Sequence, residues 1–93
     1  MPALSGQKTV ATAGTALALG SQVINAPLMI KALDTNTGIA AVGNDGSEDV
    51  TVSNGMRLEA GDVIIMEFVG NLANIIVDVA VNGEGVAWLA LNA

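Results

Sequence analysis

Side chains that carry oxygen ligands gather in one short segment, GNDGSED at residues 43–49. Asn44, Asp45, Glu48 and Asp49 could together bind a hard cation such as Ca²⁺, which prefers carboxylate and amide oxygens. Their order does not follow the ligand pattern of an EF-hand loop. A solvated acidic loop is therefore the favoured interpretation, with cation binding as its alternative, and we predict no metal site.

A pair of carboxylates is the second candidate for chemistry. Glu67 and Asp78 could form an acid pair across neighbouring strands, as glycoside hydrolysis requires. Nothing in the sequence sets their separation, and the chain has only two aromatic residues, Phe68 and Trp88, that could stack on a sugar. Asp78 occupies an outward position in an alternating apolar segment, which predicts a carboxylate that faces solvent or an interface.

Nucleophilic chemistry has equally little support. No GxSxG motif surrounds any of the serines, at positions 5, 21, 47 and 53. The segment Gly83-Glu84-Gly85 lacks the following helix start that a phosphate-binding loop needs. The chain contains no His and no Cys, which removes the most common general base, the thiolate nucleophile and disulfide bonds. We predict a protein that is not an enzyme, with no catalytic residue and no cofactor.

The charge of the chain argues against two classes of partner. Nine acidic residues against three basic ones give a net charge of −6. Lys8, Lys31 and Arg57 are far apart in sequence, so they form no basic cluster for a phosphate backbone. Val63–Val81 is the most apolar stretch, but polar residues beginning with Glu67 interrupt it, which argues against a membrane span. The start, MPALSGQK, does not resemble a signal peptide. We expect synthesis in the cytoplasm, with no nucleic-acid or membrane partner.

Turn-forming Gly, Asn, Asp and Pro residues recur along the whole chain, and short segments rich in Val, Ile and Thr separate them. This alternation predicts an all-β fold, a compact antiparallel β-sandwich or small barrel that is jelly-roll-like and has about eight or nine short strands. We expect an N-terminal arm at residues 1–6 and a single β domain at residues 7–93. Strands are expected at residues 7–13, 15–19, 28–33, 38–42, 50–52, 56–59, 63–69, 73–81 and 85–91.

The last two expected strands carry the clearest pattern. Residues 75, 77, 79 and 81 are all Ile or Val, which indicates a strand with one apolar face. Asn82-Gly83 favours a hairpin turn, so residues 73–81 and 85–91 are expected to pair as neighbours. In the final strand Trp88 and Ala90 face one way, while Leu89 and Leu91 face the other. We expect one face to fill the core and the other to meet a partner.

Apolar residues make up 52% of the chain and charged residues only 13%. A subunit of this size cannot hide so much apolar surface, and exposed apolar patches commonly mark interfaces. We therefore expect a homo-oligomer whose interface uses apolar faces near residues 63–69 and 85–91. The predicted interface residues are Ile64, Met66, Phe68, Trp88, Leu89 and Leu91.

Four segments, GQKTVATAGTALAL, IKALDTNTGIAAVGNDG, NGMRLEAGDVIIMEF and VDVAVNGEGVAWLAL, resemble small virion proteins of tailed bacteriophages, of the head-decoration and head-fibre type. The resemblance is one of pattern and spans roughly residues 6–92 of the chain. It implies a compact β protein that coats a capsid, often as a trimer.

The function that follows from this resemblance is a capsid decoration, or cementing, protein. It would lie on the capsid surface of the virion, bind the major capsid protein as a homotrimer and stabilise the head. The expected capsid contacts are Met1, Pro2 and Leu4. The alternative is a tail or head-fibre module that recognises a glycan or protein of the host surface, although the loops contain mostly Gly, Asn, Asp and Ser rather than aromatic residues.

Overall fold

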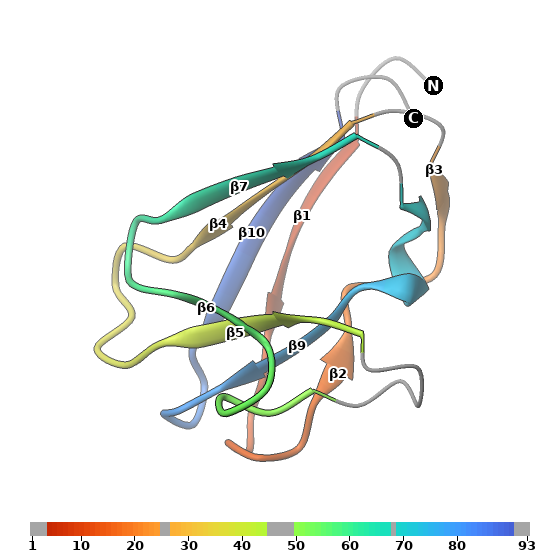
Figure 1. The fold of residues 1–93 in the computed structure, drawn as a ribbon. Helices are drawn as coiled ribbons and strands as arrows, with labels where there is room; N and C mark the ends of the chain where they lie inside the picture. Colours follow the sequence, from red (N-terminus) through yellow and green to blue (C-terminus); the bar gives the residue numbers. More distant parts are fainter. Residues whose placement is uncertain (1–3, 25–26, 45–49, 68, 91–93) are drawn as a thin grey trace.

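The computed structural model describes residues 4–24, 27–44, 50–67 and 69–90 of the chain. In these residues the chain forms short strands and one 3-10 turn (Figure 1). No helix among them is long and apolar enough to cross a bilayer. The elements are β1 (Leu4–Thr9), β2 (Leu17–Ala18), β3 (Val23–Ile24), β4 (Leu28–Ala32), β5 (Ala40–Gly43), β6 (Met56–Leu58), β7 (Val63–Met66), β8 (Gly70–Asn71), the 3-10 turn η1 (Leu72–Asn74), β9 (Ile76–Val79) and β10 (Gly85–Ala90).

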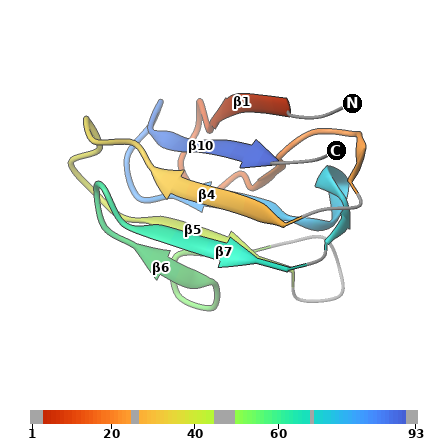
Figure 2. The same cartoon turned by 90° about the horizontal axis from the view of Figure 1, so that it is seen from above.

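Two four-stranded sheets face each other (Figures 1 and 2). Sheet A has the order β1-β10-β4-β7, sheet B has the order β2-β9-β5-β6, and a small third sheet pairs β3 with β8. Every strand pair is antiparallel. When β3 and β8 are set aside, this is the strand order of a jelly roll, in which the chain repeatedly crosses from one sheet to the other. The predicted all-β, jelly-roll-like sandwich is confirmed.

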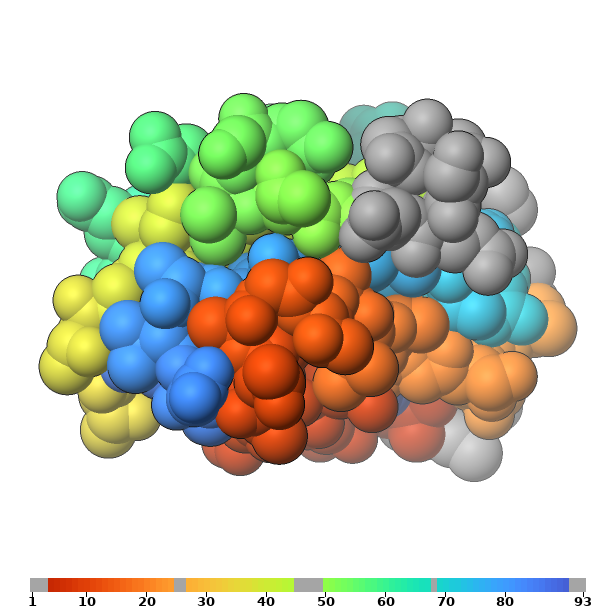
Figure 3. Space-filling model, turned by 90° about the horizontal axis from the view of Figure 1, so that it is seen from below, coloured from red at the N-terminus to blue at the C-terminus, as the bar shows by residue number. Residues whose placement is uncertain are grey.

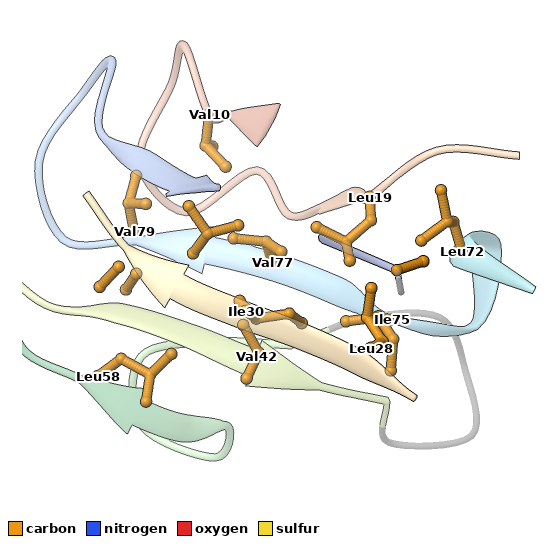
Figure 4. Packing of buried hydrophobic residues seen from close by; sticks show 14 of the residues in the cluster. Val10, Leu19, Leu28, Ile30, Val42, Leu58, Leu72, Ile75, Val77 and Val79 are labelled. Atoms are coloured by element: carbon orange, nitrogen blue, oxygen red, sulfur yellow. The ribbon is translucent and has the colours of Figure 1, made fainter. Parts of the chain in front are cut away.

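The core lies between the two sheets and is built from small aliphatic side chains (Figure 4). The two-residue period of a strand directs alternate side chains inward, so Leu28 and Ile30 of β4 meet Val77 and Val79 of β9, all at most 1% exposed. Trp88 packs against the edge of this cluster and is only partly buried. Among the described residues, the core therefore depends on many close aliphatic contacts, with no large aromatic side chain at its centre.

Sheet B is also covered on its second face. Ala41 and Ile76 point away from the main core and pack with Val50, Ala16 and Val52 in a second apolar cluster. In Figure 3, which views the molecule from the side of sheet B, the segment before β2 and the segment that follows residue 50 lie over this face. Strands that are buried on both faces need apolar residues in consecutive positions, as in Ile76–Val77.

Two of the predicted strands are placed wrongly. The first strand begins at Leu4 and not at Gln7, because residues 4–6 pair with residues 88–90 of β10. They therefore belong to sheet A and do not form an arm, while residues 1–3 lie outside the described residues. The segment 50–52 is not a strand: Val50 is buried, and a turn follows in which the amide of Gly55 donates to the carbonyl of Thr51 at 2.9 Å.

The predicted hairpin between residues 73–81 and 85–91 is also wrong. A turn does form at Asn82-Gly83, where Gly83 has a φ of 83°, but β9 lies in sheet B and β10 in sheet A. The turn carries the chain across the sandwich. β9 pairs with β2 and β5, whereas β10 pairs with β1 and β4.

Candidate interaction surface

The outward side of sheet A is the one broad sheet face that no described element covers, as Figure 2 shows from above. The register aligns its outward side chains in two rows across the four strands. One row holds Ser5, Leu89, Met29 and Ile65, and the next holds Gln7, Ala87, Lys31 and Val63.

Apolar side chains dominate the half of this face that lies over β10, β4 and β7. We call Met29, Val63, Ile65, Ala87 and Leu89 the outer patch. Ile65 is 62% exposed and Val63 is 47% exposed, which is unusual for two neighbouring aliphatic residues on one strand. Contiguous exposed apolar surface of this kind commonly marks an interface.

The structure places the predicted interface residues on different sides of sheet A. Leu89 belongs to the outer patch. Ile64, Met66 and Trp88 point inward and pack against the core cluster, because strand alternation sends even-numbered residues of β7 and β10 into the sandwich. Those three residues therefore cannot contribute to a contact through the outer face. Phe68 and Leu91 lie outside the described residues.

Of the predicted capsid contacts, only Leu4 is described, and it packs against the core cluster. Met1 and Pro2 lie outside the described residues. Leu4 is the register partner of Ala90, so the described chain starts and ends at the same end of sheet A. Leu4 is only partly buried, so part of its side chain is accessible at this end of the sheet.

Trp88 is held in place by a glycine on the neighbouring strand. Gly6 is its register partner, and a methyl group added to Gly6 would lie 2.9 Å from the indole Cζ2 atom. An indole that covers a glycine on the adjacent strand fills the space that the missing side chain leaves. This cross-strand packing explains why the inward row of β1 contains Gly6.

A groove of about 580 Å³ opens between the edges of the two sheets. Ile64, Ile65 and Met66 of β7 form its sheet A side, and Val42 of β5 and Met56 of β6 form its sheet B side. Met56 is 58% exposed. The sequence carries no signal for this groove, because it arises only when the edges of β7 and β6 lie over each other, which the strand order determines.

The Glu67–Asp78 acid pair, which the sequence did not favour, does not form. Asp78 lies on β9 in sheet B, whereas Glu67 follows β7, a strand of sheet A. Asp78 is 2% exposed, so the prediction of a solvent-facing or interface carboxylate is wrong. Its Oδ1 atom accepts hydrogen bonds from the amides of Gly14 at 2.9 Å and Val79 at 2.8 Å. Asp78 therefore ties the segment before β2 onto sheet B.

Two other polar side chains serve as structural links at the base of β10. Glu84 accepts hydrogen bonds from the amides of Thr37 at 2.6 Å and Gly38 at 2.9 Å and from the Thr37 hydroxyl at 2.9 Å. The amide donors of Thr37 and then Gly38 lower the pKa of Glu84 below its ordinary value. Asn36 bonds to both backbone groups of Gly85. These contacts hold the loop between β4 and β5 against the turn that precedes β10.

Among the described residues, no group of three acidic side chains is close enough to hold a metal ion. Of the four candidate ligand residues in this loop only Asn44 is described, and its side-chain Nδ2 atom donates to the carbonyl of Asn74 at 3.0 Å. Asp45, Glu48 and Asp49 lie outside the described residues.

The two ends of β7 are acidic. Asp62 precedes the strand and Glu67 follows it, and both are exposed. Across the outer face, Lys31 forms an exposed ion pair with Asp34 at 3.3 Å. An exposed pair of this kind contributes little to stability, but it engages the cation that lies between Ala87 and Val63 on the outer face.

Comparison with protein-family models, with curated proteins and with solved structures finds no match to this chain.

Proposed function

We propose that this protein is a non-enzymatic structural component of a tailed-phage virion, a decoration protein that binds the outer surface of the capsid as a homotrimer and stabilises the head. The observation that carries the proposal is the outer patch on sheet A. In this sandwich both faces of sheet B are covered, whereas the outer face of sheet A exposes aliphatic residues. Such a face is suited to packing against further copies of the protein.

The exposed fractions of the outer-patch residues indicate how much stabilising free energy association could contribute. Complete burial of an Ile or Val side chain stabilises by roughly 1.5 to 3 kcal/mol. Covering Ile65, which is 62% exposed, would therefore contribute about 1 to 2 kcal/mol per subunit. Met29 and Leu89 lie beside Ile65 in the same row, so one flat contact would cover all three.

The proposal that the larger partner is a capsid rests on the resemblance of the sequence pattern to phage head proteins. The jelly-roll strand order agrees with it as a fold-level analogy, since this architecture recurs in viral capsid domains. A trimer that engages several capsid subunits at once gains avidity from repetition, so each single contact can be weak. The net charge of −6 favours binding to a protein shell over binding to the packaged nucleic acid.

The experiment uses particles of the phage that encodes the chain, prepared with and without the protein. We expect the protein to copurify with intact heads, and heads that lack it to release their DNA at a lower temperature. Adding back the purified protein should restore the wild-type release temperature. The Ile65→Asp variant, which places a charge in the outer patch, should not restore it.

A matched control separates loss of the patch from loss of the fold. Gln7→Asp introduces the same charged side chain on the same face of sheet A, on the strand farthest from β7. It should restore head stability as the wild type does. Protein that is absent from purified heads, or heads whose stability does not depend on it, would contradict the proposal, and binding to intact host cells would instead support a recognition module.

A further inference from the structure

The free edge of β7 differs from the other sheet edges of the molecule. Strands at a sheet edge expose unpaired N–H and C=O groups, and proteins usually protect them with charges, with glycine or proline, or by keeping them very short. Among the described strands, β2 has only two residues, β6 has three and includes Arg57, and β1 contains Gly6 and Lys8. β7 reads Val-Ile-Ile-Met and has none of these features.

Among the described strands, β4 alone pairs with β7. In an antiparallel pair, alternate residues direct their backbone groups towards the partner strand and the rest direct theirs away. Half of the backbone groups of Val63–Met66 therefore point to the open side of sheet A, where no described residue pairs with them as a strand.

The groove lies along this same open side. A strand added to the edge of β7 would place its inward side chains beside Ile64 and Met66 and opposite Val42 and Met56, which line the groove. Its outward side chains would extend the row of Met29 and Ile65. Backbone pairing and an apolar pocket for alternate side chains are the two elements of recognition by strand addition.

Charge determines which strand fits. Asp62 and Glu67 stand at the two ends of β7, so an added strand meets an acidic group at each end. A second copy of β7, related by a two-fold axis, would bring the exposed Asp62 and Glu67 carboxylates of both copies together at the two ends of the paired strands, and like charges gathered in this way repel each other. The three basic residues of the chain are far apart, and no described strand has one at each end of an aliphatic run.

From the free edge, the groove and the acidic ends together, we infer that β7 accepts an extended segment of a different protein by strand addition. The segment carries aliphatic side chains at alternate positions and a basic residue at each end. This inference does not depend on the proposed function, because the edge would bind such a segment whether or not the protein decorates a capsid.

The experiment uses the full chain and three labelled nine-residue peptides, KTVTVTVTK, ETVTVTVTE and KTVTPTVTK, in a fluorescence anisotropy titration. The first should bind. The second, with acidic ends, should bind about tenfold more weakly. The third should not bind at the same concentrations, because the central proline removes an N–H from the added strand and disfavours its pairing. Equal binding of all three peptides, or no binding of the first, would overturn the inference.

Two variants with the same change in net charge locate the site. Glu67→Gln removes one acidic end and should weaken binding of KTVTVTVTK about two- to fivefold. Gln7→Lys also raises the net charge by one but lies on β1, the opposite edge of sheet A, and should leave the affinity unchanged. Met56→Lys places a cation in the groove at an exposed position and should also weaken binding. An equal effect of Glu67→Gln and Gln7→Lys would show non-specific attraction and refute the site.

Amide hydrogen exchange tests the geometry directly. In the free protein, the outward amides of Val63–Met66 should exchange rapidly, and KTVTVTVTK should slow their exchange while leaving the amides of β1 unchanged. Slow exchange of these amides in the free protein, together with a mass that shows association, would mean that a second copy occupies the edge, and the inference would then be wrong.

Discussion

Replacement of Asn36 by Ala tests how the loop between β4 and β5 is tied to β10. Asn36 is 8% exposed, and its side chain extends the ladder of sheet A as a backbone group would. Its Nδ2 atom donates to the carbonyl of Gly85 at 2.9 Å, and its Oδ1 atom accepts from the amide of Gly85 at 3.3 Å.

The size of the change in the free energy of unfolding follows from the hydrogen bonds that each group loses in Asn36→Ala. Two hydrogen bonds contribute about 1 kcal/mol each, and a buried amide that loses its acceptor costs about 1 to 3 kcal/mol. The carbonyl of Gly85 keeps a donor, the amide of Leu33 at 3.1 Å, so only the amide is left without this partner. We expect Asn36→Ala to lower the free energy of unfolding by about 2 to 3 kcal/mol.

Urea denaturation followed by tryptophan fluorescence measures this change, since Trp88 is the only tryptophan and lies on β10. With a denaturant slope of about 1 to 3 kcal/mol per molar, the midpoint should fall by roughly 0.7 to 3 M. Protein concentration is kept constant because association shifts apparent stability. The control is Asn54→Ala, which removes an exposed side chain that accepts from the amide of Thr51 at 2.8 Å. If Asn36→Ala costs no more than this control, the reasoning about the buried link is refuted.

Three further predictions concern neighbouring contacts. The lowered pKa of Glu84 means that its charged form stabilises the folded state at pH values above the ordinary carboxyl pKa. This stabilisation is lost as the pH falls through the pKa of the folded state. In urea titrations, the difference in stability between the wild type and Glu84→Gln should therefore narrow below about pH 4.5. Asp78→Ala should release the segment before β2 and raise its amide exchange, while the amides of β4 remain protected. Gly6→Val should displace the indole of Trp88 and shift its fluorescence emission, whereas Gly20→Ala, where an added methyl meets the Leu72 side chain at an ordinary contact distance of 3.4 Å, should leave it unchanged.

The strands that the sequence predicted best are those whose alternation reflects one buried face. Val86, Trp88 and Ala90 point into the sandwich while Ala87 and Leu89 point out, as the period of two predicted for this segment. β3 and β8 were missed because each has two residues and lies among turn-forming residues. No periodicity can be detected over so short a length.

The errors at Asp78 and at the predicted hairpin share one physical cause. A turn motif determines local chain reversal, but the sheet that each flanking strand joins is determined by tertiary packing. In a jelly roll most consecutive strands join opposite sheets, so Asn82-Gly83 links β9 to β10 without pairing them. The outward face of β9 would be solvent-exposed in a simple hairpin, but the segment before β2 covers it, and a polar residue there becomes a buried acceptor.

The candidate surface was predictable only in outline. Composition correctly indicated apolar residues in excess, and Leu89 was placed on an outward face. Ile64 and Met66 were expected at the interface because they belong to a wholly apolar strand, in which alternation cannot identify the inward side. The register with β4 resolves this point, since Met29 aligns with Ile65 and Ile30 with Ile64.

The most direct test of the central claim, that copies of this protein cover the outer patch, is the mass in solution. Sedimentation equilibrium at micromolar concentration should give three times the subunit mass of 9.3 kDa, and Ile65→Asp should give a folded single subunit. A wild-type protein that remains a single subunit, or an Ile65→Asp variant that remains as associated as the wild type, would contradict it.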